Sequence, residues 1–147
     1  MNSHEFNQSL DNLPNLKKLV INSREFNKSV NKLPETLKEL HISSLWFNKS
    51  VDNLPKNLKI LTILGNAFNK SLDNLPNNLQ ILKIFSYYFS NALCNLPNNL
   101  QILILGCNIC NSFKQSLSNL PISLKTIEIT SYKNSYPHNK YYNDYDM

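Results

Sequence analysis

The stretch Phe68-Asn-Lys-Ser-Leu-Asp-Asn-Leu-Pro76, continued by Leu79-Gln-Ile-Leu82-Lys-Ile84, decides the fold because its pattern recurs along the chain. Six copies cover Phe6 to Ile129, and each contains a Leu-Pro dipeptide. The prolines of these dipeptides are 20, 21, 21, 21 and 24 residues apart, at Pro14, Pro34, Pro55, Pro76, Pro97 and Pro121. A period near 21 residues is typical of a solenoid, in which each coil is too small to bury its apolar side alone.

The second half of each copy reads L-x-x-L-x-[I/L], which is the strand segment of a leucine-rich repeat. It predicts six short parallel strands within Leu16–Ile21, Leu37–Ile42, Leu58–Ile63, Leu79–Ile84, Leu100–Leu105 and Leu124–Ile129. About 21 residues leave no room for a long helix, so we expect an extended or 3₁₀-like return through the Leu-Pro dipeptide. The predicted fold class is a β-rich, leucine-rich-repeat-like solenoid with one short parallel strand per repeat.

Repeated slots of the pattern predict the core. Side chains that alternate along a strand point to opposite faces. The inward ladders are expected at Leu19, Leu40, Leu61, Leu82, Leu103 and Ile127, and at Ile21, Ile42, Ile63, Ile84, Leu105 and Ile129. An aromatic spine is expected at Phe6, Phe26, Phe47, Phe68, Phe89 and Phe113. Buried asparagines that satisfy backbone groups are expected at Asn7, Asn27, Asn48 and Asn69, and at Asn12, Asn53, Asn74, Asn95 and Asn119.

Length and composition fit one domain with a core. The chain has 147 residues, of which 41% are hydrophobic, and no apolar run is long enough to span a bilayer. We divide it into residues 1–130, the six-copy solenoid, and residues 131–147, a Tyr- and Asn-rich cap or tail. The N-terminus has no signal-peptide character, so we expect an intracellular protein that does not bind membranes.

The cysteines give little indication of a metal site. Cys107 and Cys110 have C-x-x-C spacing, but a second ligand pair is missing nearby, and structural zinc needs four ligands. The sequence therefore predicts no metal and no cofactor, while metal binding by this pair stays open.

The Phe-Asn opening, the central Leu-Pro and the L-x-x-L-x-I close resemble the FNIP-repeat family, a divergent branch of leucine-rich repeats, over residues 6–130. The chain differs from the usual family motif by having Lys-Ser or Gln-Ser after Phe-Asn. The family is abundant in social amoebae and giant DNA viruses, which implies a location in the host cytoplasm if the source is a virus. Some members carry an F-box that recruits a ubiquitin ligase. We expect none here, because the first repeat begins at residue 6, but an adaptor-like role is implied.

We expect function at the positions of the repeat whose residues differ from coil to coil. The outward strand slots vary between coils, and a solenoid presents them as one continuous sheet face. We predict that an unidentified protein partner binds there, at Lys18, Glu39, His41, Ile60, Thr62, Ile81, Lys83, Ile102 and Ile104. The alternative is that β-branched residues at these positions only suit strands. Among the charged residues, His41 and Glu39 are expected to form a surface ion pair instead of a catalytic site.

Two other functions can be weighed from the sequence. Lysine ladders at Lys17, Lys38, Lys59 and Lys125 and at Lys28, Lys49 and Lys70 would suit nucleic acid. The chain has a single arginine, Arg24, and no aromatic residues between the lysines, so nucleic-acid binding is the weaker alternative. Histidines lie far apart and no catalytic motif is present, so we predict a non-enzymatic protein. The unprotected edge of the first coil also predicts edge-to-edge self-association.

Overall fold

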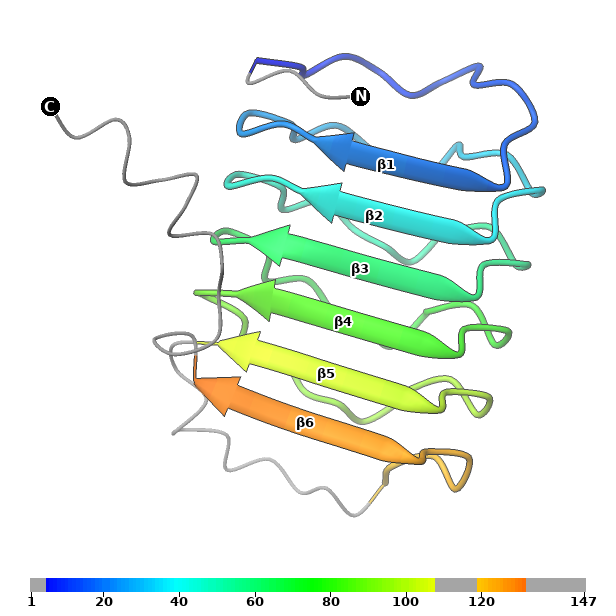
Figure 1. Cartoon of the computed structure of the whole chain (residues 1–147), viewed down its shortest axis with the longest axis vertical. Coiled ribbons are helices and arrows are strands. Elements are labelled where there is room, and N and C mark those ends of the chain that lie inside the picture. Colours follow the sequence, from blue (N-terminus) through cyan, green and yellow to red (C-terminus); the bar gives the residue numbers. More distant parts are fainter. Residues whose placement is uncertain (1–4, 108–118, 132–147) are drawn as a thin grey trace, which may run out of the picture.

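The structure, a computed structural model, describes residues 5–107 and 119–131. Six parallel strands form one sheet in sequence order, as Figure 1 shows. They are β1 (Lys18–Asn22), β2 (Glu39–Ser43), β3 (Ile60–Gly65), β4 (Ile81–Ser86), β5 (Ile102–Cys107) and β6 (Thr126–Ser131). Each coil adds one strand beside the last, so the predicted leucine-rich-repeat-like solenoid is confirmed.

Each strand begins two residues after the leucine that opens its predicted segment. The reason is a turn at that leucine. The Leu58 amide donates a hydrogen bond to the Pro55 carbonyl at 3.0 Å, and the Leu79 amide bonds Pro76 in the same way. The return is thus extended backbone interrupted by single turns. Within the described residues, no 3₁₀ helix forms.

The inward ladders and the spine make up the core. Leu40, Leu61 and Leu82 are fully buried, like the isoleucines two residues after them. The five described spine rings stack along the solenoid with centroids 5.9 to 6.1 Å apart and planes within 11° of parallel. This regular stacking confirms the spine from Phe6 to Phe89, and Phe113 lies outside the described residues.

The last coil differs from the predicted core. Ile127 and Ile129 occupy inward slots, but they are 41% and 37% exposed. The expectation that they are buried is wrong because β6 is the last strand of the sheet, and no described coil covers its outer side. A solenoid buries its interior only between neighbouring coils.

The asparagines fall into two classes. In the slot after the spine ring, each side-chain oxygen accepts a hydrogen bond from the backbone N–H of the same slot in the next coil. Asn7 accepts from the Asn27 N–H at 3.0 Å, and Asn27 accepts from the Asn48 N–H at 3.1 Å. This confirms their backbone-pairing role, but their predicted burial is wrong, because Asn7 is exposed and the others are half-buried. The slot before Leu-Pro is exposed, so its predicted burial is wrong. There Asn74 donates its amide to the Asp52 carboxylate of the previous coil.

The division into a solenoid and a tail stays a prediction, because residues 132–147 lie outside the described part. In that described part, no helix is long and apolar enough to cross a membrane.

Candidate functional site

The outward side chains of the sheet, which we call the strand face, lie in three rows across the strands. Parallel pairing without a register slip aligns each row. The first row contains Lys18, Glu39, Ile60, Ile81, Ile102 and Thr126. The second contains Val20, His41, Thr62, Lys83, Ile104 and Glu128. All nine predicted binding residues therefore share this face, and their binding of a partner stays a prediction.

The N-terminal end of the strand face is charged and paired internally. Lys18 Nζ lies 2.8 Å from Glu39 Oε2, and His41 Nε2 lies 3.6 Å from the same oxygen. The hydrogen bond from Lys18 lowers the pKa of the Glu39 carboxyl, and His41 adds a smaller effect in the same direction. The predicted His41–Glu39 surface pair is therefore present. His41 Nε2 is itself buried without a hydrogen-bond partner among the described residues.

The centre of the strand face is apolar. Ile60, Ile81 and Ile102 lie side by side on β3, β4 and β5, with Ile104 in the next row. All four are half-buried, as expected for a sheet surface open to solvent. Adjacent parallel strands are about 4.8 Å apart, so these side chains together form a continuous apolar strip on the sheet surface.

A third row was missed by the sequence analysis. Strands β3 to β6 continue two residues past the last predicted inward position, and β1 and β2 continue one, so Leu64 and Phe85 also point outward. Both are half-buried. The signal was available, because period-two alternation continued beyond Ile63 and Ile84 reaches these two residues. We define the apolar patch as Ile60, Leu64, Ile81, Phe85, Ile102 and Ile104.

Gly106 shapes one corner of this patch. It pairs with Phe85 across β4 and β5, and a Cβ atom at Gly106 would overlap the Phe85 ring at Cδ1. The ring therefore lies against the bare glycine backbone. The missing side chain lets Phe85 extend the apolar patch over β5.

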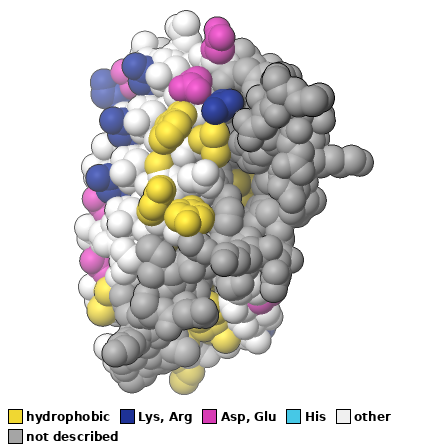
Figure 2. Space-filling model, turned by 90° about the vertical axis from the view of Figure 1, so that its left-hand side faces the viewer, with side chains coloured by type: hydrophobic (Ala, Val, Ile, Leu, Met, Phe, Trp, Pro, Cys, Tyr) yellow, Lys and Arg dark blue, Asp and Glu magenta, His cyan; other side chains and the backbone are white. Residues whose placement is uncertain are grey.

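Exposed aromatic residues collect at the edge where the strands end. Trp46 and Tyr88 are 52% and 56% exposed and occupy the same slot, just before a spine ring, in coils two and four. Tyr87 packs edge-on against Tyr88 with ring centroids 4.9 Å apart. Figure 2 looks onto this edge and shows a group of hydrophobic side chains beside a column of Lys, Arg, Asp and Glu. These exposed aromatic residues are not among the binding residues predicted from the repeat pattern.

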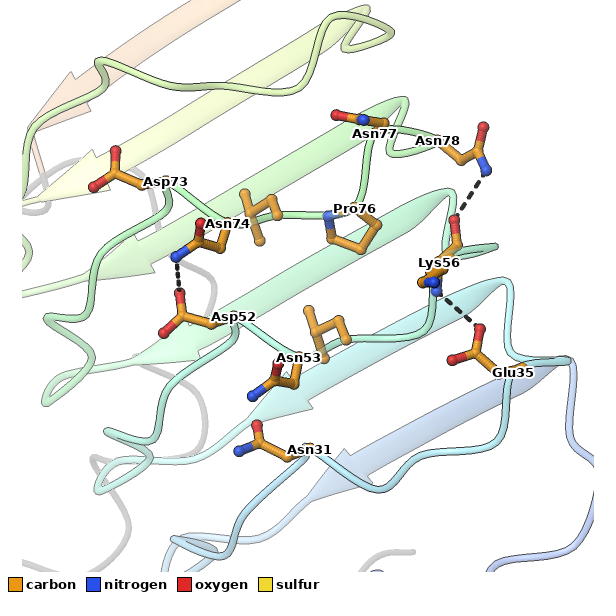
Figure 3. A pocket seen from close by; sticks show the side chains of 12 residues that line it. Asn31, Glu35, Asp52, Asn53, Lys56, Asp73, Asn74, Pro76, Asn77 and Asn78 are labelled. Carbon is orange, nitrogen blue, oxygen red and sulfur yellow. Dashed lines mark hydrogen bonds between the residues drawn. The ribbon is translucent and has the colours of Figure 1, made fainter.

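The return side carries a shallow hollow lined by Asn, Asp and Lys side chains from successive coils, shown in Figure 3. Its carboxylates are already engaged. Asp52 accepts hydrogen bonds from Ser50 at 2.6 Å and from Asn74 at 3.4 Å, and Asp73 repeats the arrangement one coil on. The polar side chains of the hollow are therefore used in hydrogen bonds within and between coils, and these bonds hold the coils in register.

The lysine ladders lie on two different sides of the solenoid. Lys17, Lys38 and Lys59 directly precede the strands, whereas Lys28 and Lys49 come after the turn at the opposite strand ends. Because the two ladders lie on separate sides, they do not form one continuous basic surface along which a nucleic acid backbone could lie. No group of three metal-binding side chains occurs in residues 5–107 and 119–131. The Cys107–Cys110 pair falls outside the described side chains.

Comparison with known proteins agrees with this geometry. No protein-family model matches the chain, and no curated protein matches it. It is similar to the giant-virus protein CroV588, whose crystal structure is described as a novel circular LRR protein, with 30% identity and a TM-score of 0.63. The similarity covers 86% of this chain but only 19% of that one. The chain is thus a parallel β-solenoid of the leucine-rich-repeat type.

Proposed function

We propose that the protein is a non-enzymatic interaction module that binds a protein partner on the strand face. The observation that carries this proposal is the apolar patch on β3 to β5. Repeated slots supply the core, so the six apolar residues of the patch are not needed to stack the coils. An apolar surface of this kind on a soluble repeat is typical of a protein contact.

Substitution of Ile81 tests the proposal directly. Ile81 lies in the middle strand of the patch, and a glutamate there would place a hydrated carboxylate where the partner has to make an apolar contact. We expect Ile81→Glu to lose a protein that the wild type captures from native cells, identified by mass spectrometry, while the melting temperature stays within a few degrees. Removing water from that carboxylate is unfavourable in an apolar contact, so capture should be lost.

Ile122→Glu is the matched control. Ile122 is fully exposed in the return of the last coil, away from the strand face, so the same substitution there should leave capture intact. Equal capture by Ile81→Glu and wild type would contradict the proposal.

The FNIP resemblance supports a narrower version, in which the captured partner is a subunit of a ubiquitin ligase in the cytoplasm of an infected or native cell. The same capture experiment distinguishes it, because a ligase subunit would then be recovered. Recovery of RNA instead, with binding that falls steeply as salt rises, would favour the nucleic-acid alternative.

We also propose edge-to-edge self-association. The C-terminal end face, consisting of Ile127 and Ile129, exposes two apolar side chains on β6, which has no strand of the described residues on its outer side. Exposed sheet edges pair with other chains unless they are protected.

A further inference from the structure

Lys83 is a single charged residue inside the apolar patch. Its register neighbours are Thr62 on β3 and Ile104 on β5, and its same-face neighbours on β4 are Ile81 and Phe85. The four diagonal positions are Ile60, Leu64, Ile102 and Gly106. Seven of the eight surrounding positions thus offer no polar side chain, and the side chain of Lys83 is half-buried.

No carboxylate of the described residues forms an ion pair with Lys83. Glu39 is engaged by Lys18 and His41. Glu128 lies two strands away across Ile104, and the two charges do not come within ion-pair distance. Lys18, by contrast, occupies the same kind of surface and has its carboxylate at 2.8 Å.

A partner that covers the patch must remove water from Lys83. Desolvating an ammonium group is unfavourable unless an opposite charge replaces the water, so a wholly apolar partner would be penalised. A carboxylate that meets Lys83 inside an apolar contact would convert this penalty into selectivity.

We propose that the partner presents an aspartate or glutamate flanked by apolar side chains, and that its carboxylate pairs with Lys83 while the flanking groups cover the apolar patch. This inference rests on the proposed function and names the chemistry of the ligand. A segment of protein fits best. An anionic membrane or a nucleic acid backbone would require several cations, and the patch offers one.

Selection from a random peptide library on the immobilised full chain tests the inference. We expect wild-type protein to enrich peptides with Asp or Glu between apolar residues. One enriched peptide is then synthesised and its affinity measured. Lys83→Glu should weaken its binding at least tenfold, and replacing the peptide's acidic residue by lysine should restore binding to Lys83→Glu. Lys49→Glu, an exposed lysine away from the strand face, is the matched control and should bind as wild type.

The outcomes separate this inference from the proposed function. Peptides that are lost with Ile81→Glu but lack acidic residues, or are unaffected by Lys83→Glu, overturn the inference alone. Peptides unaffected by both substitutions, or no enrichment at all, count against both. Lys83-dependent binding to phosphatidylserine vesicles in the absence of peptide enrichment would overturn the inference in favour of a membrane surface.

Discussion

At the scale of single residues, the two glycines of the chain are required for different reasons. Neither has positive φ, so their role is close approach and not backbone freedom. A Cβ at Gly65 would overlap the backbone carbonyl oxygen of Ser44 in the previous coil, whereas a Cβ at Gly106 would meet only the movable ring of Phe85.

This difference predicts unequal costs for the same substitution. Gly65→Ala forces two coils apart at the backbone, so we expect a loss of about 3 kcal/mol in the free energy of unfolding. Gly106→Ala asks only for a new rotamer of Phe85 and should cost about 1 kcal/mol. Urea unfolding of both variants measures this, and equal destabilisation would contradict the contact at Ser44.

The Glu39 carboxyl gives a second prediction at this scale. Its pKa is lowered chiefly by the Lys18 hydrogen bond, so the folded state favours the carboxylate. This contribution to stability is present above the unfolded-state pKa and is lost as pH falls through the folded-state pKa. We expect Lys18→Met to raise the Glu39 pKa in an NMR titration.

Lys28→Met, which removes a lysine outside this cluster, serves as the control and should leave the titration of Glu39 unchanged. An unaltered Glu39 midpoint in Lys18→Met would show that the ion pair does not persist in solution.

At the scale of elements, the repeat made the strands predictable because the core slots hold the same residue types in every coil. Leu19, Leu40 and Leu61 must fill identical spaces, so their spacing alone gives strand order and register. Strand ends were harder to predict. Every strand continues past its last inward position whatever residue follows, because Asn22 and Ser43 stand there in β1 and β2, and Leu64 and Phe85 stand there in β3 and β4.

The candidate site was predictable only in part, because the repeat determines which face a side chain lies on but not which side chains pair there. Its rows follow from strand alternation, so the nine residues could be placed on one face. The pairing of Glu39 with Lys18 and the absence of such a partner for Lys83 among the described residues depend on side-chain reach across strands. Repeat periodicity contains no information on that. The exposed Trp46 and Tyr88 are unpredictable likewise, because their slot holds Glu25 and Ala67 in other coils.

At the scale of the whole molecule, the stack has two ends that differ from its middle. Between coils, each apolar surface is covered by an equivalent one from the next coil. At β6 the inward isoleucines are exposed, and at the other end Phe6, Leu13 and Leu16 are only partly buried. In the proposed self-association, a β1 edge placed beside β6 would repeat the contact that neighbouring strands of the described residues already make.

Association of this kind would be head-to-tail. A head-to-tail contact does not close into a dimer, so the average mass should keep rising with protein concentration. We expect sedimentation equilibrium of the full chain to show this rise, and we expect Ile129→Glu to suppress it. The melting temperature of that variant should change little, because the side chain is already 37% exposed. Tyr88→Glu, which removes a larger exposed apolar side chain from the fourth coil, should associate as wild type does. A constant monomer mass, or equal suppression by Tyr88→Glu, would show that the end face of β6 is not the contact, since only a contact at the open edge of β6 distinguishes these two positions.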